Sequence, residues 1–176
     1  MKLLIVTQKV DANDQLLGFF IPWLERFAKK FESVLVLCLQ EGIHALPSNV
    51  RVISLGKERG FPKALQLGRF WWYCFQLRGH YDAVFVHMNP IWVVVGASLW
   101  HRLGKKVFFW YTHKAVTTKL RLAEKLADVI FTASPESFRL PSKKVIITGH
   151  GIDTELFKPD PAVRRLPMSI LTVGRI

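Results

Sequence analysis

Residues 83–110, AVFVHMNPIWVVVGASLWHRLGKKVFFW, contain the pattern that decides the fold. Two short apolar runs, Ala83–His87 and Val107–Trp110, flank a longer apolar segment that begins at Pro90. Proline suits the first position of a helix, because its φ is already helical and no N–H is needed there. The stretch therefore predicts strand, helix and strand in succession, which is the unit from which parallel sheets are built.

The same alternation continues in both directions along the chain. Further strands are expected at residues 3–6, 34–39, 50–55, 129–132 and 145–148, and helical segments at 16–31, 62–78, 120–127 and 135–140. The strands are apolar without interruption, which is typical of strands covered on both sides. We therefore predict an α/β fold, a Rossmann-like parallel sheet with helices on both faces.

The composition fits one packed domain with a strong positive charge. The chain has 176 residues, half of them hydrophobic, which supports a core of this size and argues against disorder. Its formal charge is +12, so phosphates, nucleic acid or an anionic membrane surface are candidate partners. Cys38 and Cys74 lie in apolar stretches and are expected to be buried, reduced thiols.

Several common enzyme classes are not indicated by the sequence. It contains no G-x-G-x-x-G dinucleotide fingerprint, no serine nucleophile elbow, no paired carboxylates at hydrolase spacing and no zinc-ligand cluster. The apolar run at 91–100 falls well short of the roughly 20 residues that a membrane-spanning helix needs.

Polar residues follow the predicted strands, at the edge where an open parallel sheet binds its ligands. The candidates are His87, Asn89, His113, Ser134 and His150. His113 has the alternative of a capping or surface histidine, and His87 and Asn89 that of satisfying loop backbone. Gly18 precedes the first helical stripe. It is either an ordinary loop glycine or one that lets a phosphate reach backbone amides.

Two later segments resemble a known family. Residues 149–159, GHGIDTELFKP, are similar to the N-G-V/I-D-x-x-x-F-x-P segment of family 4 glycosyltransferases. Residues 173–175 resemble the V-G-R of that family's second domain, at the family's spacing. The resemblance implies a GT-B fold, which consists of two Rossmann-like domains. Residues 1–148 would then form the N-terminal, acceptor-side domain, 149–168 the interdomain linker, and 169–176 the first strand of a second domain. We expect this chain to be the N-terminal half of a longer enzyme and inactive alone.

The resemblance also implies a reaction. The family transfers a sugar from a nucleotide diphospho-sugar to an acceptor, with retention of anomeric configuration, usually without a metal and with no cofactor besides the donor substrate. It implies that Arg175 faces the donor diphosphate, that Gly18 lies near the diphosphate, and that His113 lies near the transferred sugar as the catalytic candidate. His150 stands where the family often has asparagine. The expected acceptor is a glycan or a lipid-linked saccharide, and its side of the site would include His87, Asn89, Ser134 and His150.

Residues 61–78 combine aromatic and basic side chains. On a helical wheel one face holds Leu67, Trp71, Cys74 and Phe75, and the largely opposite sector holds Lys63, Gln66, Arg69 and Gln76. The favoured interpretation is a core helix with a wide apolar face. The alternative is a helix that lies on an anionic membrane surface. The expected localisation is cytoplasmic, with peripheral attachment to the inner face of the plasma membrane under the alternative.

A non-catalytic function is the rival interpretation. A basic Rossmann-like module could bind a nucleotide or nucleic acid without catalysis, and the net charge allows it. Outside residues 61–78, however, the sequence has no basic stripe with interleaved aromatic residues and no recognition-helix pattern. We therefore expect no nucleic-acid partner and favour the glycosyltransferase.

Overall fold

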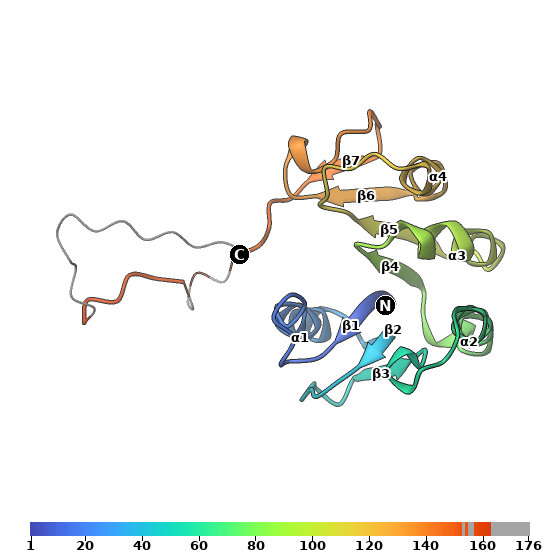
Figure 1. Ribbon diagram of the computed structural model, residues 1–176, viewed down its shortest axis with the longest axis horizontal. Coiled ribbons are helices and arrows are strands. Elements are labelled where there is room, and N and C mark those ends of the chain that lie inside the picture. The colour runs from blue at the N-terminus through green and yellow to red at the C-terminus, as the bar shows by residue number, and fades with distance from the viewer. Residues whose placement is uncertain (153, 155–156, 163–176) are drawn as a thin grey trace.

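The computed structural model describes residues 1–152, 154 and 157–162. Within them, a parallel sheet of seven strands in the order β3-β2-β1-β4-β5-β6-β7 forms the centre, which confirms the predicted Rossmann-like α/β fold (Figure 1). The strands are β1 Lys2–Val10, β2 Ser33–Glu41, β3 Val50–Ser54, β4 Ala83–His87, β5 Lys106–Trp110, β6 Val129–Thr132 and β7 Val145–Ile147.

The helices cover the two sides of the sheet unequally. The α-helices are α1 Phe20–Lys30, α2 Lys63–Gln76, α3 Pro90–Arg102 and α4 Thr118–Leu126, and three short 3₁₀ turns are η1 Lys57–Arg59, η2 Arg78–His80 and η3 Pro135–Ser137. In Figure 1, α1 lies on one side of the sheet, whereas α2, α3 and α4 lie on the other. Of the α-helices in the described part of the chain, three therefore close one side and one closes the other.

Neighbouring residues of one strand belong to two separate apolar layers. In β5, Val107 and Phe109 belong to the layer beneath α2, α3 and α4, and Phe108 and Trp110 belong to the layer beneath α1. We call these the closed layer and the open layer. This division follows from the pleat of a strand, which turns neighbouring side chains to opposite faces.

The ends of α4 show how the chain satisfies its helix termini. Thr117 Oγ1 accepts a hydrogen bond from the amide of Leu120 at 3.1 Å, which caps the first turn. At the other end, Lys144 Nζ donates to three backbone carbonyl oxygens between residues 124 and 127, at 2.9, 3.0 and 2.9 Å. A cation at this position also suits the negative end of the helix dipole.

The first helix begins later than predicted, at Phe20 instead of Leu16. The carboxylate of Asp14 accepts hydrogen bonds from the amides of Leu16 and Leu17, at 2.9 and 2.8 Å, and holds both residues in a loop. Leu16 and Phe19 are consequently exposed and are not part of the core stripe.

The predicted apolar face of the 62–78 helix is partly wrong. The buried side of α2 consists of Gln66, Phe70 and Cys74, whereas Trp71 and Phe75 are exposed. Gln66 is tolerated there because its side-chain amide donates to a backbone carbonyl at 2.6 Å. The cysteine prediction is confirmed: Cys38 and Cys74 are buried free thiols, and burial raises the pKa of Cys74 to about 12.

Beyond β7, the described residues up to Ala162 form no helix or strand. The strand predicted at 169–176, and Arg175 with it, lies outside the described residues. Among the helices that the structure describes, none is long and apolar enough to cross a membrane.

Candidate functional site

A large cavity lies along the carboxyl edge of the sheet on the side of α1. Strand order reverses at β1, because β2 and β3 follow on one side of it and β4 to β7 on the other. In open α/β sheets, ligands bind in the crevice at such a reversal. The cavity has a volume of about 1090 Å³, which lies at the upper end of the range for small-molecule sites.

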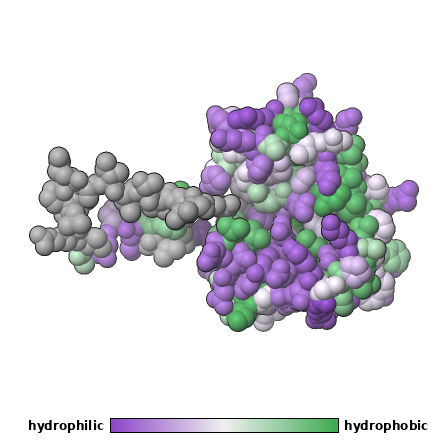
Figure 2. Space-filling view, in the orientation of Figure 1, coloured by the Kyte–Doolittle hydropathy of each residue, from purple (hydrophilic) through white to green (hydrophobic). Residues whose placement is uncertain are grey.

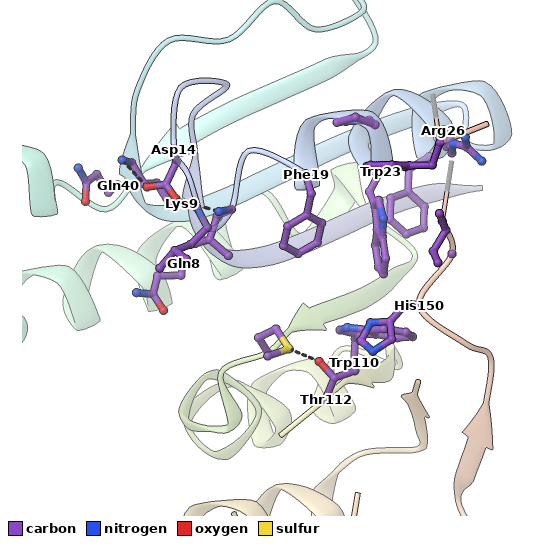
Figure 3. A pocket seen from close by; sticks show the side chains of 18 of the residues that line it. Gln8, Lys9, Asp14, Phe19, Trp23, Arg26, Gln40, Trp110, Thr112 and His150 are labelled. Carbon is purple, nitrogen blue, oxygen red and sulfur yellow. Dashed lines mark hydrogen bonds and ion pairs between the residues drawn. The ribbon is translucent and has the colours of Figure 1, made fainter. Parts of the chain in front are cut away.

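Three aromatic side chains form one part of the cavity lining, and we call them the aromatic wall: Phe19, Trp23 and Trp110. The Trp23 and Trp110 rings meet edge to face with centroids 5.1 Å apart, and the Phe19 and Trp23 centroids are 6.1 Å apart. Figure 3 shows Phe19 and Trp23 extending from the α1 side toward Trp110 and His150. Phe19 is 51% exposed, so the wall offers a wide apolar surface to a ligand.

Basic side chains from separate elements also line the cavity, and we call them the basic rim: Arg26, Lys30 and Lys57. Arg26 and Lys30 come from α1, and Lys57 comes from η1 after β3. Together they give the cavity a positive potential, which favours an anionic ligand group such as a phosphate.

The loop before α1 is fixed by an ion-pair cluster at the floor of the cavity. Lys9 Nζ lies 2.8 Å from Asp14 Oδ2 and 2.9 Å from Asp11 Oδ2. The hydrogen bond from Lys9, together with those from two loop amides, lowers the pKa of Asp14 to about 2. The same carboxylates raise the pKa of Lys9. The two carboxylates thus compensate the charge of Lys9, and Lys9 holds the loop that carries Phe19 in place.

Gly18 closes this loop tightly. Its amide donates to the Asp14 carbonyl at 2.9 Å. A Cβ built at Gly18 would lie 2.6 Å from that same oxygen and 3.1 Å from the Ala12 carbonyl oxygen, so a larger residue would force the loop open. The described geometry explains this glycine by loop packing, and its own amide is already engaged within the loop.

His87 lies beneath the aromatic wall and does not line the cavity. Its ring stacks on Phe20 with centroids 4.1 Å apart, and its Nδ1 lies 3.1 Å from Thr7 Oγ1 across the β1–β4 boundary. Burial lowers its pKa to about 3, so the imidazole is neutral at physiological pH. His87 Nε2 is buried without a hydrogen-bond partner.

The turn after β4 contacts a residue that follows β5. Met88 lines the cavity and has a φ of 64°, which is unusual for a residue other than glycine. Its sulfur accepts a hydrogen bond from Thr112 Oγ1 at 3.1 Å, and Thr112 also lines the cavity. Asn89 Oδ1 accepts a hydrogen bond from the amide of Ile91 at 3.4 Å and thereby caps α3. Asn89 thus satisfies backbone, which is the alternative to a binding role that the sequence leaves open.

The remaining predicted residues lie at the same edge but are not all brought together. His150 lines the cavity, whereas the exposed His113 does not and only follows the lining residue Thr112. The Nδ1 atom of His113 accepts a hydrogen bond from the Ala115 amide at 3.1 Å. Ser134 lies after β6 and pairs with Ser137 Oγ at 3.1 Å. Within the described ranges, no group of three or more His, Cys, Asp or Glu side chains could hold a metal ion.

The sequence pattern misses the aromatic wall. It assigns Phe19 and Trp23 to the core stripe of the first helix and Trp110 to the apolar strand at 107–110, without giving any of the three a place in the site. A usable signal is that Trp110 is the last residue of its strand, where side chains reach the ligand edge of a parallel sheet.

Comparisons with known proteins identify the fold. A scan against protein-family models gives no match, and a search of curated sequences gives none. Among solved structures, HepE from Anabaena in complex with UDP matches with a TM-score of 0.60 and 19% identity, over 92% of this chain and 47% of that one. MurG from Acinetobacter baumannii matches with a TM-score of 0.53 and 18% identity, over 89% and 47% of the two chains.

A UDP-GlcNAc 2-epimerase from Methanocaldococcus jannaschii matches with a TM-score of 0.54 and 14% identity, over 84% of this chain and 45% of that one. This chain therefore spans about half the length of each of these structures. At such identities the likeness concerns architecture alone. The chain has the Rossmann-like fold found in GT-B glycosyltransferase-type proteins.

Proposed function

We propose that this chain forms the acceptor-side half of a retaining family 4 glycosyltransferase, which moves a sugar from a nucleotide diphospho-sugar to a glycan or lipid-linked acceptor. The observation that carries the proposal is the cavity at the strand-order reversal, which combines an aromatic wall with a basic rim. The structures of HepE with UDP and with UDP-glucose support the choice of a nucleotide sugar, since each matches 92% of this chain in fold.

The two parts of the cavity suit different parts of such substrates. The aromatic wall offers broad ring faces to the apolar side of a sugar ring or to a lipid chain. The basic rim attracts a phosphate or diphosphate group. His150 borders the wall and is proposed on the acceptor side, together with Asn89 and Ser134 at the same edge. His87 acts there only as a buried support, because its ring is inaccessible.

The proposed chemistry needs charge stabilisation more than proton transfer. As the bond between the anomeric carbon and the diphosphate oxygen breaks, negative charge builds on the leaving nucleotide diphosphate, an acceptor hydroxyl oxygen bonds to that carbon, and the hydroxyl proton passes to the leaving diphosphate. Arg175 is proposed to bind that diphosphate with a two-pronged hydrogen bond, and the loop around Gly18 to lie near it. No resident cofactor or metal is proposed beyond the donor substrate.

His113 is proposed to contact the transferred sugar. Its Nδ1 accepts from the Ala115 amide, so in the neutral imidazole the proton lies on Nε2. That N–H can donate to a sugar hydroxyl next to the reacting carbon. The contact would orient the sugar and would be lost on substitution by alanine.

We further propose a cytoplasmic protein that works at an anionic membrane surface, without a nucleic-acid partner. The net charge of +12 supports an anionic surface. Because this chain spans about half of the matched structures, the proposed activity belongs to a protein that carries both halves of the fold.

Product analysis tests the proposed function. The two-domain protein is incubated with a panel of nucleotide sugars and a fraction of glycans and lipid-linked saccharides, and the linkage of the product is read by NMR. We expect sugar transfer with retained anomeric configuration, and a loss of about 100-fold in kcat for His113→Ala. The neighbouring exposed Lys114→Ala is the matched control. Conversion of a UDP-sugar to its C2 epimer without an acceptor would contradict the proposal in favour of an epimerase.

A further inference from the structure

The outer side of α2 is an apolar surface that faces solvent. Leu65, Trp71, Trp72 and Phe75 are 45%, 46%, 56% and 51% exposed. The small residues Ala64 and Gly68 of the same helix are exposed as well. We call the four large side chains the α2 outer face. Large apolar side chains gathered in this way mark an interaction surface more often than an accident of packing.

This surface continues toward α3. Trp71 Nε1 donates to the Val95 carbonyl at 2.9 Å, so one tryptophan is anchored between the two helices. Val94, Val95 and Leu99 of α3 are only partly buried. Figure 2 shows hydrophobic side chains along the flank of the molecule where α2 and α3 lie.

The sequence of α2 and its nearest flanking residues carries basic side chains and no acidic ones. From Arg59 to Tyr81, and again from Ala83 to Ala123, the sequence contains no acidic residue. Arg78 lies at the end of α2, with its guanidinium 4.3 Å from the centroid of the Phe75 ring. Lys105 follows α3, and its Nζ lies 5.3 Å from the centroid of the Tyr81 ring. Arg78 therefore borders the α2 outer face, whereas the ring that Lys105 contacts is buried outside that face.

We propose that the α2 outer face docks on an anionic lipid bilayer, with Leu65 and Trp72 entering the interfacial region and Arg78 contacting lipid phosphates. This inference rests on the membrane partner of the proposed function and assigns that partner a defined surface of the protein. Tryptophan suits the boundary between headgroups and acyl chains, because its indole is apolar with one polar N–H. Basic residues add electrostatic attraction to anionic headgroups.

A second copy of the chain is a less suitable occupant. Two copies meeting through this face would bring the Arg78 side chains of both together, and residues 59–81 contain no acidic side chain to compensate them. Like charges in an interface oppose association. An anionic bilayer supplies the complementary charge instead.

Arg69 is part of the fold and is not available to lipid. Its guanidinium lies 5.4 and 5.3 Å from the Phe61 and Tyr73 ring centroids, and it donates to the Ser54 carbonyl at 3.1 Å. Charge variants that test membrane binding must therefore leave Arg69 in place.

Sedimentation with vesicles tests the docking surface. We expect binding to phosphatidylcholine vesicles that contain one third phosphatidylglycerol, and several-fold weaker binding to phosphatidylcholine alone. Added salt should weaken the anionic binding, because the Debye length shrinks from about 10 Å at 0.1 M to about 3 Å at 1 M. Equal or absent binding to the two kinds of vesicle would overturn the proposal.

Paired variants localise the contact. Leu65→Gln with Trp72→Gln should weaken binding about tenfold or more, since two side chains lose their place in the apolar region. The matched control, Ile43→Gln with Leu122→Gln, removes two exposed apolar side chains elsewhere and should leave binding unchanged. Arg78→Gln should weaken binding several-fold, against the exposed Lys119→Gln as the control. Equal effects of test and control pairs would overturn the proposal.

Two further measurements separate the remaining outcomes. Lipids with brominated acyl chains should quench tryptophan fluorescence, and Trp72→Phe should remove much more of the quenching than Trp23→Phe. A concentration-dependent dimer that the Leu65 and Trp72 changes abolish would assign this face to a second copy and overturn the proposal. These assays contain no sugar donor or acceptor, so their failure is distinct from failure of the proposed transferase activity.

Discussion

The two layers of this sheet differ in how completely they are covered. Beneath α2, α3 and α4, the closed layer contains fully buried rings such as Trp100, Phe70 and Tyr81. On the opposite side, α1 alone covers the open layer, where Trp23 and Phe131 remain partly accessible. The cavity with its aromatic wall lies on this second side. One side of the sheet therefore holds the fully buried core, whereas the other leaves apolar surface open along a cavity.

The largest effect should come from a closed-layer ring. Trp100→Ala removes a fully buried side chain and should lower the free energy of unfolding by about 3–5 kcal/mol, measured by urea denaturation. Trp23→Ala in the aromatic wall is the matched change and should cost less than half as much, because the ring is only partly buried. Similar decreases in the free energy of unfolding for the two variants would contradict the proposed difference between the layers.

The second prediction concerns the buried His87, where the open layer meets the β1–β4 boundary. Burial lowers its pKa from 6.5 to about 3, so below pH 6.5 the unfolded chain binds a proton that the folded chain excludes. Stability should therefore fall as the pH decreases from 6.5 toward about 3, with a contribution of at most about 1.4 kcal/mol per pH unit.

His87→Phe keeps the ring stacked on Phe20 but cannot be protonated. Its free energy of unfolding should depend less steeply on pH over the same window than that of the unchanged protein. The measurement is urea denaturation at a series of pH values. Identical slopes for the two proteins would show that His87 is accessible to protons in the folded state.

A smaller and more local effect is expected in the loop beneath the aromatic wall. Asp14→Ala removes the carboxylate that accepts from the Leu16 and Leu17 amides and pairs with Lys9. Hydrogen exchange at these two amides should accelerate, whereas exchange in the closed layer should not change. Asn13→Ala, in the same loop, is the control. Unchanged protection of both amides in Asp14→Ala would mean that Asp14 does not hold the loop.

The sequence predicts the sheet better than it predicts the surfaces. The unit from Ala83 to Trp110 is read correctly, because its strands are short apolar runs and Pro90 marks the helix start. The start of α1 is missed because the apolar stripe begins at Leu16, before the loop that Asp14 holds. Hydrophobic periodicity cannot detect that competing set of side-chain hydrogen bonds.

The two surfaces were harder to predict for a different reason. A helical wheel shows which residues share a face, but it does not show which face meets the sheet. In α2, Gln66 is buried and Trp72 is exposed, the reverse of what hydrophobicity alone predicts. The sequence points to the edge of the sheet where the cavity lies and to His150, which lines it, but the burial of His87 depends on Phe20 from a distant segment.

The chain's tryptophans allow the most direct test, because their indole N–H signals report on three regions at once. Trp23 and Trp110 lie in the aromatic wall, Trp71 and Trp72 on the α2 outer face, and Trp92 and Trp100 in the closed layer. In a protein that carries both halves of the fold, we expect addition of UDP-glucose to shift the signals of Trp23 and Trp110 in ¹⁵N NMR spectra and to leave those of the other four tryptophans in place. Shifts confined to the α2 outer face or the closed layer, or no shift at Trp23 and Trp110, would contradict a ligand site on the open side of the sheet.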